Sequence, residues 1–299
     1  MDRSLAAAAL AGAALASIAV RLVQTRLGAS APAPSLGVEG GEKQWLILVR
    51  HGDRFDYANP TWKDRVKGLG GRPRDPPLSA LGHRQAERFG RAAAATLGRR
   101  GGSVRVRSSP YLRCLQTSMP LCDALDVPLE LEPGVAEVQH KVSNVAAFAE
   151  RFAYFPRLVD AASPDATVDE EAWPLGYMER IARFGAALTA ELDEALASGD
   201  GASTLVLTSH AASVGLVAWL LGTELASDLR MAPVGCYVLA RDSAAEPWRL
   251  LRAGDTNAPY NAENSATTFP WGYKPDYLDA WAAAHGGARF PRPTRGGAS

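Results

Sequence analysis

An apolar run that breaks off in Arg-His-Gly stands out in the amino-acid sequence: residues 45–54 read WLILVRHGDR. Its first five residues predict a buried strand, because the run is short, bulky and bounded by polar residues. His51 then lies at the carboxyl end of that strand, which is where α/β sheets bind their ligands. Arg50 and Arg54 flank the histidine, and this combination at a strand end indicates phosphate chemistry.

The charge balance and the pattern of cysteines and histidines argue against two classes of function. The 299 residues contain 32 Lys and Arg against 32 Asp and Glu, whereas dedicated nucleic-acid binders usually carry a basic excess. The three cysteines, Cys114, Cys122 and Cys236, have no metal-ligand or disulfide-framework spacing, and the five histidines form no zinc motif. We therefore expect no nucleic-acid partner, no metal and no cofactor.

The N-terminal residues differ in composition from the rest of the chain. Residues 5–20 form an alanine-dominated apolar run flanked by Arg3 and Arg21. The run is short for a membrane span, which needs ~20 predominantly apolar residues. A secretory signal, a weak signal anchor and an organelle transit peptide all fit residues 1–27. We expect membrane-anchored, organellar or secretory targeting of a soluble catalytic domain, with membrane contact through the apolar run.

Strand and helix patterns alternate along the remaining sequence. Strands are expected at residues 45–49, 104–107, 129–131, 204–210, 236–240 and 248–251. Helices are expected at residues 80–97, 111–125, 145–155, 177–197, 211–221 and 276–285. This alternation predicts an α/β fold, a three-layer α/β/α sandwich with a mainly parallel central sheet.

Composition also suggests where the folded domain begins and ends. Residues 28–42 are rich in Ala, Pro, Ser and Gly and are typical of a linker, and residues 43–255 form the expected catalytic domain. Residues 256–299 are expected to be a C-terminal extension that wraps the surface. Within the domain, residues 55–77 form a long irregular segment directly after His51, which favours an active-site wall.

Local signals place two helix starts. Ser79 is a candidate N-cap for the helix at residues 80–97. Before the next helix, Ser109 is expected as the N-cap and Pro110 at the first helical position. Arg113 then lies in the first turn, near the positive end of the helix dipole.

Four motifs in this order carry a family resemblance: LVRHGDR, SSPYLRCLQT, EPGVAE and LVLTSHA. With them the chain resembles the histidine phosphatase superfamily, the phosphoglycerate-mutase-like group, over residues 45–239. The stretches RHGDRFD, DPPLSALG and SPYLRCLQT are most similar to the phosphatase domain of Sts-type proteins and of ecdysteroid-phosphate phosphatases. We expect neither the ubiquitin-binding nor the SH3 domain of the Sts-type proteins in this chain.

The resemblance implies a role for each of six residues. His51 would be the nucleophile that forms a phosphohistidine, His210 the second histidine of the site, and Glu137 the proton donor to the leaving oxygen. The residues that would bind the phosphoryl oxygens are Arg50, Arg54 and Arg113. Glu132 and His140 are neighbouring alternatives to Glu137.

General chemistry agrees with these roles. A neutral imidazole is nucleophilic near pH 7 because its unperturbed pKa is ~6.5. Planar arginines meet phosphoryl oxygens bidentately, and helix N-termini add amide donors. Phosphoryl transfer depends mostly on positioning and electrostatics, so a metal is not required. The aromatic residues Phe55, Tyr57 and Trp62 either shape a substrate site or only pack.

The expected activity is that of a metal-independent phosphatase acting on a phosphorylated small molecule or a phosphopeptide. A mutase of the phosphoglycerate type is the first alternative, although the segment after His51 matches the Sts-type pattern better. A non-catalytic binding protein on the same fold is the second, although a degenerate member would be expected to have lost His51 or an arginine.

Overall fold

The computed structural model describes most of one compact unit, which comprises residues 34–299. The described residues are 34–68, 74–137, 151, 154–160, 172–199, 201–223, 231–254, 256, 260–261 and 275–291. The predicted targeting segment at residues 1–27 and most of the predicted helix at 145–155 lie outside them. Within the described ranges, no helix combines the length and the apolar character that crossing a membrane requires.

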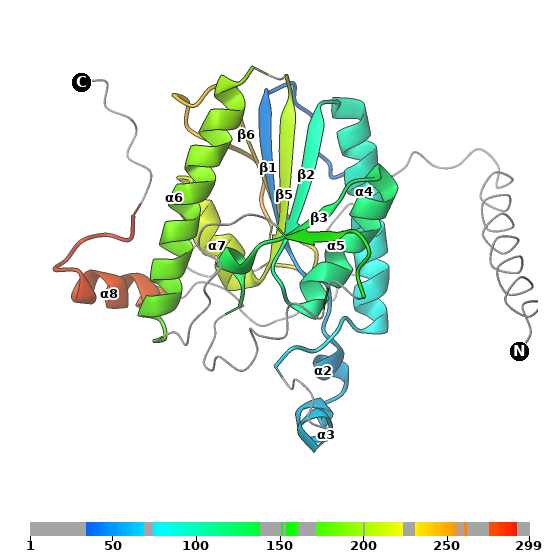
Figure 1. Ribbon diagram of the computed structural model, residues 1–299. Coiled ribbons are helices and arrows are strands. Elements are labelled where there is room, and N and C mark those ends of the chain that lie inside the picture. The colour runs from blue at the N-terminus through cyan, green and yellow to red at the C-terminus, as the bar shows by residue number, and fades with distance from the viewer. Residues whose placement is uncertain are drawn as a thin grey trace, which may run out of the picture. The chain divides into compact units, whose positions relative to one another are not determined.

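A seven-stranded sheet forms the middle layer, with β1 near its centre (Figure 1). In sheet order the strands are β4 (Leu158–Asp160), β3 (Leu129–Leu131), β2 (Ser103–Ser108), β5 (Ser203–Ser209), β1 (Gln44–Arg50), β6 (Cys236–Arg241) and β7 (Arg249–Arg252). The first five run parallel, whereas β6 and β7 are antiparallel to their neighbours. The prediction of a mainly parallel sheet is confirmed.

Helices cover both faces of this sheet because the side chains of β1 alternate between two apolar clusters. Ile47 and Val49 pack in the cluster with α4 (Ala80–Arg100) and α5 (Leu112–Leu125). Leu46 and Leu48 pack in the other cluster, with α6 (Leu175–Ala197), α7 (Ala211–Leu220) and α8 (Pro275–Ala284). All seven β1 residues are buried, and the predicted three-layer α/β/α sandwich is confirmed.

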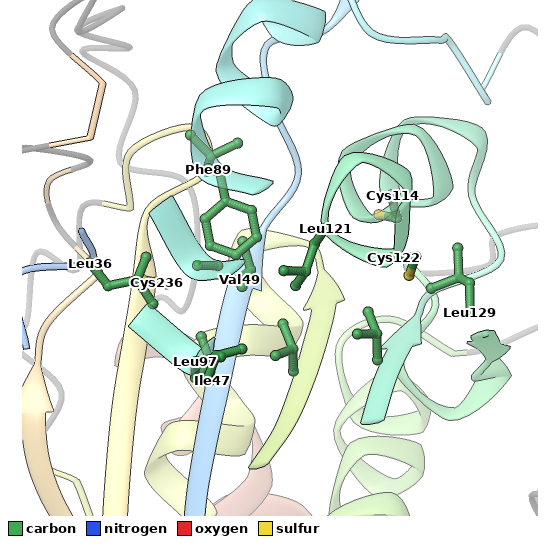
Figure 2. Packing of buried hydrophobic residues seen from close by; sticks show 14 of the residues in the cluster. Leu36, Ile47, Val49, Phe89, Leu97, Cys114, Leu121, Cys122, Leu129 and Cys236 are labelled. Atoms are coloured by element: carbon green, nitrogen blue, oxygen red, sulfur yellow. The ribbon is translucent and has the colours of Figure 1, made fainter. Parts of the chain in front are cut away.

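Figure 2 shows the first cluster, in which Phe89 and Leu97 of α4 and Leu121 of α5 close over Ile47 and Val49 of β1. All five side chains are at most 2% exposed. Burying such side chains contributes about 1.5–3 kcal/mol each, so this layer fixes β1 and the residue that follows it.

Residues on both sides of the predicted catalytic domain contribute to the clusters. Leu36, in the predicted linker, is fully buried; its backbone N–H donates to Oγ1 of Thr96 at 3.0 Å. From the predicted C-terminal extension, Tyr260 packs in the first cluster and Trp281 and Phe290 pack in the second. Both segments are therefore part of the packed unit where they are described.

Two local predictions were wrong. The segment at 55–77 is not wholly irregular, because it contains the short helices α2 (Phe55–Ala58) and α3 (Trp62–Gly68). Helices of four and seven residues are too short to show an apolar period, so the sequence pattern could not separate them from a loop. The three-residue edge strand β4 was not predicted either, for the same reason.

Candidate active site

The two histidines that end strands lie next to each other. His51 follows β1 and His210 follows β5, and these strands pair in parallel, which brings their carboxyl ends to one edge of the sheet. The backbone N–H of His51 donates to the carbonyl oxygen of Ser209 at 2.9 Å. The ring centroids of His51 and His210 are 5.4 Å apart, with an interplanar angle of 64°.

The hydrogen bonding of His51 defines which ring nitrogen is free to react. Its Nδ1 lies 2.7 Å from the carbonyl oxygen of Gly52, which can only accept, so Nδ1 carries the proton and Nε2 keeps its lone pair. Burial, and then the charges of Arg113 and Arg50, hold the pKa of His51 well below its usual range. The ring is therefore neutral near pH 7.

Gly52 allows the turn after β1 to pack tightly. A Cβ atom at this position would lie 2.9 Å from the carbonyl oxygen of Gly82 in α4. The backbone N–H of Gly52 donates to Oγ1 of Thr117 in α5 at 3.0 Å. The turn that carries His51 is thus held by helices α4 and α5.

His210 is oriented through both ring nitrogens. Its Nε2 lies 2.9 Å from Oγ of Ser109, and its Nδ1 lies 3.1 Å from Nη2 of Arg113 and 3.3 Å from Oε2 of Glu137. Because an arginine can only donate, Nδ1 accepts from Arg113 and Nε2–H donates to Ser109. Burial, and then Arg113 and His51, hold the pKa of His210 well below its usual range.

The prediction that Ser109 caps α5 is therefore wrong, since its hydroxyl belongs to His210. Tyr111 occupies the N-cap position without a side-chain cap, and α5 begins at Leu112. Oδ1 of Asp75 accepts from the backbone N–H of Leu112 at 2.9 Å and takes over the capping role. Arg113 still lies in the first turn, as expected. The other predicted cap is confirmed, because Oγ of Ser79 accepts from Gly82 in the first turn of α4.

Two of the three predicted phosphate-binding arginines are almost fully buried at this edge. Arg50 is 2% exposed and Arg113 1% exposed. Nη1 of Arg50 donates to the carbonyl oxygen of Met231. Among the described residues, Nε of Arg50 and both Nε and Nη1 of Arg113 have no hydrogen-bond acceptor. Leaving a buried donor unsatisfied costs about 1–3 kcal/mol, so these groups favour a bound oxyanion.

Arg54 is partly committed to its own neighbours. Its Nε and Nη2 donate to the two carboxylate oxygens of Asp56 at 2.9 and 2.6 Å, and its guanidinium stacks 4.7 Å from the ring centroid of Tyr57. The charge of Arg54 nevertheless contributes to the lowered pKa of His51, behind burial and the two buried arginines. It lies within electrostatic range of His51.

Glu137 contacts His210 and Arg113 from the loop after β3. Its side chain is 31% exposed, and its Oε2 lies 3.5 Å from Nη2 of Arg113, beside the contact with His210. The alternative Glu132 is buried and accepts from the backbone N–H of Gly134 at 2.9 Å, which makes it a local cap. The other alternative, His140, lies outside the described residues.

Arg180 holds this loop, although no sequence motif predicts such a role for it. It is a buried residue of α6 that donates to the carbonyl oxygens of Gly134 at 2.7 Å and Ala136 at 3.1 Å. Oγ of Ser209 donates to the carbonyl oxygen of Val135 in the same loop. The available signal was a charged residue between the apolar positions Met178 and Ile181 of an amphipathic helix.

The three aromatic residues after His51 divide into two groups. Phe55 and Trp62 pack edge to face, with ring centroids 5.6 Å apart, which supports the packing interpretation. Tyr57 is 37% exposed beside Arg54. Across the described part of the chain, no group of three His, Cys, Asp or Glu side chains is arranged to hold a metal ion.

Comparisons with known proteins show which family the chain belongs to. The chain is 30% identical over 124 residues to the ecdysteroid-phosphate phosphatase of Bombyx mori, a match that covers 33% of this chain and only 18% of that protein. The crystal structure of the Bombyx mori ecdysone phosphate phosphatase in complex with tungstate has a TM-score of 0.51 and 18% identity, covering 71% of this chain and 93% of the solved one.

A phosphoserine phosphatase from Entamoeba histolytica, in complex with 3-phosphoglyceric acid, gives a TM-score of 0.44 and 17% identity, covering 72% of this chain and 98% of the solved one. The profile of the histidine phosphatase superfamily, branch 1, matches residues 46–256. That range contains both strand-end histidines and every other predicted site residue. The chain that places His51 and His210 side by side is a member of the histidine phosphatase superfamily.

Proposed function

We propose that this protein is a metal-independent phosphatase that hydrolyses a phosphomonoester through a phosphohistidine on His51. One observation carries the proposal: a neutral, buried imidazole with an unprotonated Nε2 lies within electrostatic range of two buried arginines that have N–H groups without acceptors. Those N–H groups belong to Arg50 and Arg113. A nucleophile and an oxyanion site of this kind suit phosphoryl transfer.

In the first step, Nε2 of His51 attacks phosphorus while the bond to the leaving oxygen breaks. Glu137 gives its proton to that oxygen. General acid catalysis of this kind typically raises the reaction rate ~10²–10⁴-fold. The imidazole becomes cationic as the N–P bond forms. The hydrogen bond from Nδ1 to the carbonyl oxygen of Gly52 stabilises that charge.

In the second step, water attacks the phosphohistidine, and the carboxylate of Glu137 accepts a proton from this water. The N–P bond breaks, and the lone pair returns to Nε2 of His51. Phosphate leaves, and both residues regain their starting protonation states. Arg50 and Arg113 hold the phosphoryl oxygens throughout, while Arg54 adds its charge from beside Asp56.

His210 presents Nδ1 to the same phosphoryl group. In the free protein this nitrogen accepts from Arg113. A bound phosphoryl dianion favours the protonated ring, and a proton on Nδ1 lets His210 donate to a phosphoryl oxygen while Nε2–H remains on Ser109. His210 thereby contributes charge only when substrate is present.

The substrate is a phosphomonoester of a small molecule or a peptide. The Bombyx mori relative is named as a phosphatase of ecdysteroid phosphate, which supports a phosphorylated small molecule. We also propose that residues 1–27 direct the protein to a membrane, an organelle or the secretory route. A fluorescent fusion that carries residues 1–40 tests this: uniform fluorescence throughout the cell would reject a targeting role.

Activity on p-nitrophenyl phosphate, with and without EDTA, tests the catalytic proposal. We expect turnover that EDTA leaves unchanged and that His51→Ala abolishes. Turnover of 3-phosphoglycerate alone, dependent on a bisphosphate primer, would indicate a mutase instead. Absence of turnover with every phosphomonoester would reject the proposal.

A further inference from the structure

We propose that Asp75 is a positioning residue that attracts the guanidinium of Arg113 and limits its pairing with Glu137, so that Glu137 can carry the proton for the leaving oxygen. This inference rests on the proposed function of the site. It starts from a buried carboxylate at the first residue of the DPPLSALG stretch, a residue to which the resemblance assigned no role. Asp75 is 5% exposed and lies just before α4 in the chain.

Asp75 is fully engaged at the start of α5. Its Oδ1 accepts from the backbone N–H of Leu112 at 2.9 Å and lies 3.7 Å from Nη1 of Arg113. Its Oδ2 forms an ion pair with Nη2 of Arg151. The carboxylate therefore caps the helix and lies between two guanidinium groups, of which only that of Arg113 reaches His210.

Arg113 is shared between two carboxylates through different nitrogens. Asp75 faces Nη1, whereas Glu137 faces Nη2 at 3.5 Å, beside Nδ1 of His210 at 3.1 Å. The Arg113 side chain is 1% exposed, so water screens these interactions poorly. A change that weakens the electrostatic attraction between Asp75 and Arg113 therefore strengthens the ion pair between Arg113 and ionised Glu137.

Asp75 and Glu137 contact the same guanidinium, and like charges oppose each other's ionisation. Both interactions are lost when Asp75 is replaced by Asn. The other groups that face Glu137 do not change with Asp75; they are His210 in contact and Arg50, Arg54, Cys114 and Tyr277 within electrostatic range. Burial raises the pKa of Cys114 to about 12, so this thiol stays neutral.

Arg151 supplies the opposite perturbation. Arg151 neutralises part of the negative charge of Asp75. Removing Arg151 therefore strengthens the electrostatic attraction between Asp75 and Arg113. The two substitutions Asp75→Asn and Arg151→Met therefore act on the ionisation of Glu137 in opposite directions. A role of Asp75 in packing alone predicts no such opposition.

The test compares kcat/KM across pH on p-nitrophenyl phosphate, whose leaving group needs little protonation, and on n-butyl phosphate, whose leaving group needs a proton. Asp75→Asn keeps Oδ1 as a cap. In this variant we expect the alkaline limb of the kcat/KM profile to shift to lower pH by about half a pH unit. We expect the loss on n-butyl phosphate to exceed that on the aryl ester by ~tenfold. In Arg151→Met the alkaline limb of the same profile should shift to higher pH.

Asp193→Asn is the matched control, because it removes a carboxylate paired with Arg241 at 2.6 Å on β6, far from the strand ends that carry the histidines. It should leave both profiles unchanged. Equal losses on the two substrates, with no displacement of the alkaline limb in either variant, would overturn the inference. If Asp75→Asn does not fold, an unmoved limb in Arg151→Met overturns it alone. Phosphoenzyme formation on His51 is measured separately, so failure of the proposed function is distinguishable.

Discussion

Ser109 holds His210 in one orientation: the Oγ atom of the serine lies 2.9 Å from Nε2 of the histidine. The two residues are 101 positions apart in the sequence and meet because β2 and β5 are adjacent parallel strands. The contact directs Nδ1 of His210 toward Arg113 and Glu137.

Removing this hydroxyl should loosen His210. We expect Ser109→Ala to lower kcat/KM by about tenfold, because a lost hydrogen bond of roughly 1–1.5 kcal/mol no longer selects the ring orientation. Ser108→Ala is the matched control, since its Oγ donates to a backbone carbonyl and does not contact His210. Equal activity of the two variants would show that the contact does not orient the ring.

Acid should destabilise the folded protein through the two buried histidines. Their folded-state pKa values lie well below the unfolded value of ~6.5, so the unfolded state binds more protons below that pH. The free energy of unfolding should be nearly constant just above pH ~6.5 and fall as the pH decreases below it. Urea unfolding between pH 8 and pH 5 measures this slope. His51→Asn should reduce the slope, whereas the exposed His83→Asn should preserve it.

Inorganic phosphate should bind the free protein and stabilise it, because it supplies acceptors for the buried N–H groups of Arg50 and Arg113. At a concentration ~100 times the Kd, the stabilisation is about 2.7 kcal/mol and appears as a raised Tm. Arg113→Met should abolish the shift. The control Arg105→Met removes an exposed arginine paired with Glu130 and should retain it. A shift that survives Arg113→Met would place the anion elsewhere.

Arg180→Met should impair the acid step as well as stability. It removes the donors that hold the carbonyl oxygens of Gly134 and Ala136, and with them the position of Glu137. We expect a loss of about 2–4 kcal/mol in the free energy of unfolding, because buried carbonyl groups lose a charged partner. The remaining folded enzyme should lose more activity on n-butyl phosphate than on p-nitrophenyl phosphate. An equal loss of activity on both substrates would show that Arg180 does not position Glu137 for proton donation.

The strand-end histidines were predictable from the sequence because each closely follows a short apolar run that favours a buried strand. His51 and His210 therefore had defined places before any tertiary contact was known. The position of Arg113 in the first turn of α5 was predictable in the same way. These inferences needed only local patterns and the geometry of a parallel sheet.

The residues that orient this site were not predictable, because their partners are distant in sequence. Ser109 has the local pattern of an N-cap, but His210 takes its hydroxyl and Asp75 caps the helix instead. The distance from Asp75 to its partner Leu112 is 37 positions, and Arg180 contacts a loop 44–47 positions away. No periodic pattern records such pairings.

Trapping the phosphoenzyme shows directly whether His51 carries the phosphoryl group. The protein is mixed with a fast-reacting phosphomonoester, quenched in alkali, which preserves phosphohistidine, and digested for mass spectrometry. Because Nδ1 of His51 donates to the carbonyl oxygen of Gly52, we expect one phosphorylated residue, His51, carrying the group on Nε2. A turning-over enzyme with no phosphohistidine, or with the phosphoryl group on Nδ1 or on another residue, would contradict it.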